Sequence, residues 1–589
     1  MTTRTFRRPL YALGSLLVAA ALFQAIPASA GHELPNLDEI DPVRFSLAEA
    51  IVEREIITAR DLTTSLALDI IRPNTTEKVP TIFFQSPYYN TSGRGYKAEK
   101  KTPWGSPAIG VGSPQVPFPE WYDEYFVPRG YAVVMQDQRG TRNSSGCQVY
   151  GGPEEGNDAV DVIEWIEDQP WSNGAVGMTG GSYDGTVATA AAAQAPEALK
   201  AIIPIRAIDR WYDYHFFNGV QSSQHLLTPA SFTILRPGTE DHQNSWNEDP
   251  LIGAHVIERK ACAASIGAAV FGQYSSPYQD STGLFWSGRD FLKDAENIEA
   301  ATFIIHGLND DNVKTTNAGH LWDALPEETP KKIWWLQGGH DDPANPGLTF
   351  PLADRFKERT HRWFAQYLKD LDTGVEDSAP VSIQGENGAW TDGLAWPAPA
   401  TDRTLYLGTS GLQDAPGAGT LTYTDGTLAT SGSTITLETP PLAEELRISG
   451  QAYVTLEYSL SRGGDTTFAY RLDHVGEGEI ASAYARGAYR DEIRARGASY
   501  PTLPSPHGPE TRYEIAFPFV HQDYVVPAGD RLRLTIDADD GRTQAGGNSS
   551  TVTLYLGEKT KLVVPDAASR AAEDLRAFCH FHPETDQCE

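Results

Sequence analysis

The sequence is poor in cysteine, with four in 589 residues, and it has neither a C-x-x-C motif nor a cluster of cysteine and histidine. A structural zinc site is therefore not expected, and we predict neither a metal nor a cofactor. Beyond the first thirty residues there is no apolar run of the ~20 residues that a membrane span needs. The sequence also lacks a long charged tail and an internal repeat.

The sequence has few basic residues, with 47 lysines and arginines against 78 acids, so the formal net charge is −31 at pH 7. The acids are dispersed along the chain. Such a field repels nucleic acid and anionic lipid, so neither is expected as a partner. Apolar residues make up 40% of the chain and charged residues 21%, as in ordinary soluble proteins. Since 589 residues are too many for one core, we expect two or three domains.

Residues 1–30 have the pattern of a secretory signal peptide. Arginines at positions 4, 7 and 8 precede the apolar stretch LYALGSLLVAAALF, and Ala28 and Ala30 give the A-x-A spacing of a cleavage site. The apolar stretch is shorter than a membrane span requires, which favours a signal peptide over an anchor. We therefore expect the mature protein to be secreted, extracellular and soluble.

All four cysteines, Cys147, Cys262, Cys579 and Cys588, follow this leader. In an oxidising compartment an even number suggests two disulfides, with three possible pairings. Cys579 and Cys588 are close enough in sequence to staple the C-terminal tail, which would leave Cys147 for Cys262. The alternative is that one or more of them is free.

Short apolar runs, most of them rich in β-branched or aromatic residues, recur between about residues 79 and 340. Such runs are typical of parallel strands covered on both faces. Helical patterns at 156–168 and 185–199 alternate with them, which predicts an α/β domain with a mainly parallel sheet. The runs are 81–86, 131–137, 174–180, 199–205, 301–307 and 331–337.

Two other regions break this alternation. From about 207 to 299 there is no clear strand, which indicates an insertion lying over the sheet as a cap. After about 373, short alternating strands separated by Gly, Pro, Asp and Ser predict a β-sandwich. The predicted segments are a signal peptide (1–30), an α/β domain (31–206 and 300–372), a helical cap (207–299), a C-terminal β-sandwich (373–565) and a tail (566–589).

The stretch GMTGGSYDG places Ser182 between glycines, after an apolar strand and before an alanine-rich helix. Strand, turn and helix around a serine are typical of a nucleophile elbow, whose glycines prevent clashes beside a strained residue. The helix N-terminus would stabilise a developing oxyanion. The strict G-x-S-x-G pattern is not met, because residue 184 is aspartate and the glycine follows at 185; the alternative is an ordinary turn.

A serine nucleophile needs a base, and the base needs an acid that holds it. Asp310 directly follows one predicted strand and His340 follows the next, so both would lie at the carboxyl edge of the sheet with Ser182. Each has a structural alternative as a cap or turn residue. Asp311 could replace Asp310 as the acid. The base could instead be His306, inside a strand pattern, or His320, inside a helical pattern.

The motifs GGSYDG, HGLNDDNVKTTNAGHLWDALP and QGGHDD together resemble the Xaa-Pro dipeptidyl-peptidase and cocaine-esterase group of serine hydrolases. The resemblance spans roughly residues 45 to 557, and HGLND-NVK is closer to the peptidase branch than to the esterase branch. It implies an α/β-hydrolase domain, a helical cap and a C-terminal jelly-roll sandwich. Further matches are SPYYN (86–90), QDQRGTRNSSG (136–146), RWYDYHFFNG (210–219) and LFWSGRDF (284–291).

The resemblance implies Ser182 as nucleophile, Asp310 as acid and His340 as base. It also implies an oxyanion hole made by the hydroxyl of Tyr88 and the backbone N–H of Tyr183. Tyr89 is the neighbouring alternative to Tyr88, which could also be a packed aromatic residue.

The group often has an aromatic residue after the acid, where this chain has Asp311. A second negative charge there would raise the pKa of the His340 imidazolium. For a peptidase, the resemblance implies a cap with an apolar pocket for a proline ring and acids for a free α-ammonium. Trp211, Asp213 and Tyr214 are the candidates by position.

The sequence therefore predicts a secreted serine exopeptidase that releases Xaa-Pro dipeptides from peptide N-termini through an acyl-enzyme on Ser182. One alternative is an esterase or amidase of the same fold that acts on small acyl compounds. Another is a non-catalytic secreted binding protein, against which the complete set of serine, acid and base argues. The sequence does not give the oligomeric state.

Overall fold

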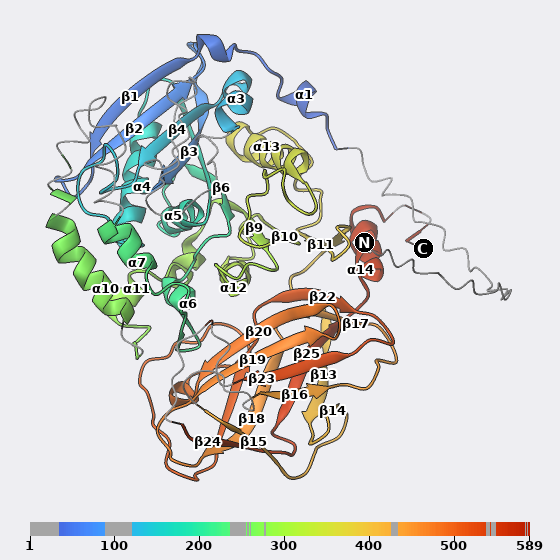
Figure 1. Cartoon of the computed structure of the whole chain (residues 1–589). Coiled ribbons are helices and arrows are strands. Elements are labelled where there is room, and N and C mark those ends of the chain that lie inside the picture. Colours follow the sequence, from blue (N-terminus) through green and yellow to red (C-terminus); the bar gives the residue numbers. More distant parts are fainter. Residues whose placement is uncertain are drawn as a thin grey trace, which may run out of the picture. The chain divides into compact units, whose positions relative to one another are not determined.

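The computed structural model describes residues 34–88, 121–235, 255, 258–259, 261–275, 278–425, 434–537, 542, 549–583, 585 and 587–588 (Figure 1). From Leu34 onward the chain forms one compact unit. The predicted signal peptide, residues 1–30, lies outside the described residues. Within those residues, every helix falls short of the length and apolar character that crossing a membrane requires.

A ten-stranded sheet forms the centre of the first part of the chain (Figure 1). Its strands are β1 (Ile51–Thr58), β2 (Ser65–Arg72), β3 (Val79–Ser86), β4 (Ala132–Asp137), β5 (Ser172–Gly181), β6 (Leu199–Ile205), β9 (Ala301–Gly307), β10 (Lys331–Leu336), β11 (Val381–Gln384) and β12 (Trp390–Gly393). The order is β1-β2-β4-β3-β5-β6-β9-β10-β11-β12. Neighbours from β4 to β11 are parallel, whereas β1, β2 and β12 add antiparallel edges. The predicted α/β class with a mainly parallel sheet is confirmed.

Helices cover both faces of this sheet. Alternate residues of β10 show the division, because Ile333 and Trp335 pack into one apolar core and Trp334 and Leu336 into another. The first core contains α4 (Pro153–Glu167), α5 (Tyr183–Ala192) and α12 (Thr316–Ala324), and the second contains α3 (Tyr122–Phe126) and α13 (Ala353–Lys369). Coverage on both faces explains why these strands are continuously apolar in sequence.

The insertion after β6 is mostly helical. It includes α6 (Trp211–His215), α7 (Thr228–Ala230), α10 (Ala268–Ser275), α11 (Leu284–Ser287), the π-helical turns η4 (Ser231–Leu235) and η7 (Ala263–Gly267), and the 3-10 helix η8 (Leu292–Asn297). It also contains a short hairpin of β7 (Phe216–Phe217) and β8 (Val220–Gln221), which the sequence analysis missed. Asn218 and Gly219 turn this hairpin with positive φ angles of 47° and 79°, so the Asn-Gly pair was the available signal.

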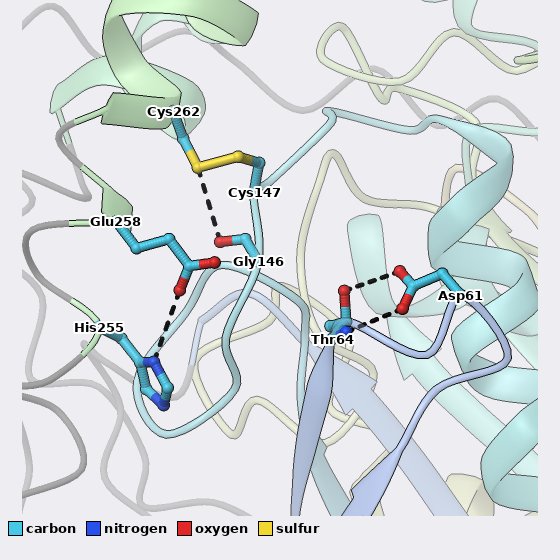
Figure 2. The surroundings of a disulfide bond; sticks show 7 residues. All are labelled: Asp61, Thr64, Gly146, Cys147, His255, Glu258 and Cys262. Carbon is cyan, nitrogen blue, oxygen red and sulfur yellow. Dashed lines mark hydrogen bonds and ion pairs between the residues drawn. A yellow bond between two sulfur atoms is a disulfide. The ribbon is translucent and has the colours of Figure 1, made fainter.

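All four cysteines are paired in two disulfides. Cys147, in the loop after β4, joins Cys262 in the insertion, and Figure 2 shows this bond bridging the two segments. Figure 2 also shows the ion pair of His255 with Glu258, in the insertion near this disulfide. Cys579 joins Cys588 near the C-terminus. This is the pairing that proximity in sequence favoured.

The rest of the chain forms a β-sandwich of two sheets (Figure 1). Inward-facing residues of both sheets form a third apolar core, of which Leu456, Phe468 and Phe517 are buried members. Its strands are β13 (Ala400–Leu407), β14 (Leu412–Gln413), β15 (Thr420–Thr424), β16 (Ile435–Glu438), β17 (Leu446–Gly450), β18 (Tyr453–Leu460), β19 (Thr467–His474), β20 (Gly478–Arg486), β21 (Tyr513–Pro518), β22 (Gln522–Val526), β23 (Leu532–Asp537), β24 (Thr551–Tyr555) and β25 (Lys561–Ala567). Of these, β16, β23, β19 and β20 form the smaller sheet.

The boundary between the two parts differs from the sequence interpretation, which began the sandwich at residue 373. Strands β11 and β12 still belong to the ten-stranded sheet, so the sandwich begins at β13. The C-terminal helix α14 (Arg570–Phe581) returns to this edge, where the Asp392 N–H donates to the Asp574 carboxylate at 3.0 Å. Composition could not reveal this, because two short edge strands have the same pattern as sandwich strands.

The disulfide between Cys147 and Cys262 should stabilise the insertion, because the bonded residues are 115 positions apart. Closing so long a loop removes much of the entropy of the unfolded chain, and typical disulfides contribute about 2–4 kcal/mol. We expect the C147S/C262S variant to lower the midpoint of urea unfolding more than C579S/C588S does, since that pair spans only 9 positions. Equal midpoints for the two double variants would contradict this ranking.

Candidate active site

The predicted catalytic residues follow neighbouring parallel strands. Ser182 follows β5, Asp310 lies in the loop after β9, and His340 lies in the loop after β10. In the sheet, β5, β6, β9 and β10 are consecutive parallel neighbours. Their carboxyl ends share one edge, so the fold brings all three loops to that edge.

Ser182 has the backbone of a strained turn, with φ 60° and ψ −121°. Its N–H donates to the Ile205 carbonyl at 2.7 Å, which ties the turn to the end of β6. The flanking glycines have a steric cause. A Cβ on Gly180 would lie 2.4 Å from Cβ of Asp184, and one on Gly185 would lie 2.7 Å from the Gly180 carbonyl oxygen. The turn therefore presents the serine only with glycine at these positions.

His340 and Asp310 are hydrogen-bonded, with 2.7 Å between Nδ1 and Oδ2. The Asp310 side chain is fully buried, and its Oδ1 accepts the N–H groups of Asn312 and Val313 at 2.9 Å each. Burial alone would raise the pKa of Asp310, but the hydrogen bond and charge of His340 outweigh it and lower that pKa. An ionised Asp310 holds Nδ1 as a donor, which leaves Nε2 of His340 to accept a proton.

The hydroxyl of Ser182 makes no hydrogen bond to the described residues, so its link to His340 stays a prediction. Arg206, the residue after β6, connects the two loops. Its Nη1 donates to the His340 carbonyl at 2.7 Å, and a Cβ on Gly181 would lie 2.5 Å from its Nη2. Hydroxyl-to-imidazole bonds are often long in ligand-free enzymes and tighten when substrate binds.

The alternative residues have other surroundings, although Nε2 of His306 lies 3.6 Å from Oδ2 of Asp310. Asp311 is exposed, and Asp310 rather than Asp311 contacts the His340 ring. His306 is fully buried inside β9 and its Nε2 bonds to the Val313 carbonyl at 2.8 Å. His320 is buried in α12 beside His521, and burial lowers its pKa to about 3. The geometry therefore favours the first choice of acid and of base.

The oxyanion candidates are the backbone N–H of Tyr183, directly after Ser182, and the hydroxyl of Tyr88. Tyr183 begins α5, and the first N–H groups of a helix have no partner within the helix and carry partial positive charge. The ring of Tyr88 lies edge-on to the Tyr183 ring, with 6.5 Å between centroids. Tyr89, the alternative, lies outside the described residues.

Glu155, in the first turn of α4, is a buried acid that the sequence analysis missed. The Tyr183 hydroxyl donates to its Oε2 at 2.9 Å and accepts the Gly151 N–H at 2.7 Å. Burial raises the pKa of Glu155 to about 7, although the Tyr183 bond opposes that rise. In sequence it is an ordinary acid of a helix N-terminus, which is why the pattern did not single it out.

The three candidate substrate-binding residues lie on α6 but differ in their surroundings. Trp211 is buried against the rings of Tyr150 and Tyr183. Asp213 is paired with Arg210 at 3.1 Å, which neutralises its charge. Of the three, Tyr214 reaches the loop of the acid.

The Tyr214 hydroxyl donates to Oδ1 of Asn312 at 3.0 Å. The ring of His225, another residue that the sequence analysis missed, stacks on Tyr214 with 4.0 Å between centroids. Among the described residues, no group of histidines, cysteines and acids could hold a metal ion.

Two family models match the chain. The model of the X-Pro dipeptidyl-peptidase (S15 family) matches residues 63–342, and that of the X-Pro dipeptidyl-peptidase C-terminal non-catalytic domain matches residues 373–583. A protein of Streptomyces avermitilis, provisionally named a Xaa-Pro dipeptidyl-peptidase, is 30% identical over 97% of this chain and 90% of its own length. A Xaa-Pro dipeptidyl-peptidase of Lacticaseibacillus casei is 31% identical over 52% of this chain and 39% of its own length.

Solved structures give the same fold. A CocE/NonD family hydrolase from Staphylococcus aureus is 17% identical and superposes with a TM-score of 0.69 over 88% of this chain and 94% of its own. An α-amino acid ester hydrolase is 20% identical, with a TM-score of 0.67 over 90% of this chain and 97% of its own. At such identities the likeness establishes the α/β-hydrolase domain with cap and C-terminal β-domain, and nothing finer.

The pKa of Glu155 predicts a pH-dependent stability. Its pKa of about 7 in the folded state lies above the ordinary value of 4.5 for a glutamate, so the folded state binds the proton more tightly. The resulting stabilisation is complete below pH 4.5 and is lost as pH rises through 7, by roughly 3 kcal/mol at most. We expect E155Q, measured by urea unfolding between pH 4.5 and 8, to lose less stability over this range than the wild type.

The matched control is E167Q, at the exposed end of α4. Its free energy of unfolding should depend on pH as that of the wild type does. An unchanged pH dependence in E155Q would refute the assignment of the titrating group to Glu155.

Proposed function

This chain belongs to the X-Pro dipeptidyl-peptidase S15 family, and on that premise we propose that it is a serine exopeptidase that releases Xaa-Pro dipeptides from peptide N-termini. The observation that carries the proposal is the 2.7 Å bond between His340 and buried, ionised Asp310, at the sheet edge that also holds the strained Ser182. A serine with an oriented imidazole is suited to acyl transfer.

In the proposed reaction, His340 takes the proton of Ser182 as the hydroxyl attacks the carbonyl carbon of the proline at the second position of the peptide. The Tyr183 N–H and the Tyr88 hydroxyl stabilise the oxyanion of the tetrahedral intermediate. His340 then protonates the leaving amine, and the dipeptide remains as an ester on Ser182. Water, deprotonated by His340, releases the Xaa-Pro dipeptide and regenerates the hydroxyl.

The proposed binding of a proline ring is supported by an aromatic residue of the cap. The Tyr214 hydroxyl donates to the Asn312 side chain in the loop of the acid, so this ring lies near the catalytic groups. We further propose that the protein is exported and acts on extracellular peptides. Two observations support export: the leader pattern of residues 1–30, and two disulfides that leave no free cysteine among the described residues. Disulfides persist in oxidising compartments.

Three substrates separate the proposed activity from its alternatives. We expect Ala-Pro-anilide to be cleaved, and N-acetyl-Ala-Pro-anilide to be resistant because it lacks the free α-ammonium. Cleavage of a p-nitrophenyl ester alone would favour an esterase, and no turnover of any of the three would favour a binding protein. The S182A variant should lose all activity; full activity in S182A would end the proposed mechanism.

The neighbouring acids Asp310 and Asp311 provide a matched pair of variants. In D310N the amide cannot stabilise the imidazolium or hold the same tautomer, and kcat should fall by about 10⁴-fold as in other triads. D311N should stay within about threefold of the wild type, because that side chain is exposed and surface charges act weakly. Steady-state kinetics on Ala-Pro-anilide measures both, and a larger loss in D311N would reverse the assignment of the acid.

A further inference from the structure

A cluster of basic side chains lies between α13 and the edge of the sheet formed by β10, β11 and β12, away from the catalytic loops. Lys332 lies near the start of β10, whereas His340 follows the end of that strand. Arg355 and Arg359 lie one turn apart on α13. All three line one small pocket. So much positive charge in one place is unexpected in a chain whose net charge is −31.

These cations form no ion pair with a carboxylate among the described residues, and the acids Asp392 and Glu376 act on Lys332 only through their nearby charge. Neither Arg355 nor Arg359 has an ion pair or a hydrogen-bond acceptor there, and the buried Nε atom of each is without a hydrogen-bond acceptor. The Arg355 guanidinium stacks instead on the Trp390 ring, 4.0 Å from its centroid. Lys332 donates only to the backbone carbonyls of Ser378 and Ala379. Asp392 is the single carboxylate in the lining, and its Oδ1 accepts the Ser382 hydroxyl at 2.6 Å.

A fourth donor, from Trp363, completes the cluster. The ring of Trp363 is 1% exposed, lines the same pocket, and has a buried Nε1 without an acceptor. Unpaired buried donors are costly, which applies to the Nε atoms of both arginines and to Nε1 of Trp363. The three cationic side chains as a whole are half-buried. Burial together with the charge of Arg359 lowers the pKa of Lys332 to about 7 and that of Arg355 to about 10. An anion bound here would relieve each of these costs.

The shape of the pocket narrows the class of ligand. The inner part has a volume of about 30 Å³, which suits a head group of roughly two water-sized atoms. It shares Lys332, Trp363, Val375 and Ser378 with an outer pocket of about 480 Å³. The outer lining has an apolar part made by Pro330, Tyr367, Pro380, Leu394 and Phe581, and a polar part made by Lys331, Glu376 and His580.

We propose that this pocket binds a small organic carboxylate, with the carboxylate among Lys332, Arg355 and Arg359 and an apolar body in the outer part. The planar guanidinium groups fit a planar carboxylate better than they fit a spherical ion. The outer aromatic and proline side chains provide apolar surface for the body of the ligand. The site is separate from the catalytic edge, so its occupancy and the peptidase reaction can be measured independently.

Calorimetric titration of the full chain tests the proposal with benzoate as the probe. Benzyl alcohol, which has the same ring without the charge, and chloride, which has the charge without the ring, are the ligand controls. We expect saturable binding of benzoate and much weaker binding of both controls. Equal binding of benzyl alcohol would overturn the role of the cations, and equal binding of chloride would overturn the carboxylate assignment.

The variant R359Q should weaken benzoate binding by about tenfold or more, since it removes a charged donor. K357Q lies on the same helix outside the lining and should bind as the wild type does. W363F keeps the aromatic body but removes the N–H donor, and serves as the second test should R359Q fold poorly. Turnover of Ala-Pro-anilide should be unchanged in both site variants, and wild-type benzoate affinity in both of them would refute the site.

Discussion

The hydrogen bond between Asp310 and His340 is the interaction on which the proposed chemistry depends. It joins two loops that are distant in sequence, and it exists only because β9 and β10 are parallel neighbours whose carboxyl ends coincide. The acid is buried, yet its pKa is lowered, because the imidazole and the backbone N–H groups of the loop stabilise its charge. A carboxylate kept ionised in this way fixes the orientation of the ring before any substrate arrives.

Polar contacts also hold the backbone on both sides of Ser182. Arg206 contacts the His340 carbonyl and lies against Gly181, so one guanidinium touches the backbone of both the loop of the base and the turn of the nucleophile. On the other side, the hydroxyl of Tyr183 is held by Glu155 and by the Gly151 N–H, which fixes the residue whose backbone N–H is the oxyanion candidate. The strained φ angle of Ser182 is therefore supported from both sides.

The sequence predicted the mainly parallel sheet well, because apolar runs report local structure directly, and the structure places the loops of Ser182, Asp310 and His340 at one edge of it. The sequence could separate Asp310 from Asp311 only by resemblance, since both follow the same strand and their burial depends on the tertiary fold. Glu155 and Arg206 escaped because their roles arise from contacts between elements. Arg206 did carry a signal, however, because it follows a strand of the same sheet edge, as Ser182 does. The Asn218-Gly219 pair carried a signal for a hairpin turn, but the strands on either side of it are only two residues long.

The sandwich contacts and supports the loop that carries Asp310. Gln522 donates from β22 to the carbonyl of Leu308 at 2.8 Å, two residues before Asp310. Thr315, just beyond the acid, donates to the His521 carbonyl at 2.8 Å. In the cap, a Cβ on Gly219 would lie 2.4 Å from the Tyr489 ring, so the hairpin turn packs tightly against the sandwich. A domain that contributes none of the proposed catalytic groups thus restrains both the acid loop and the cap.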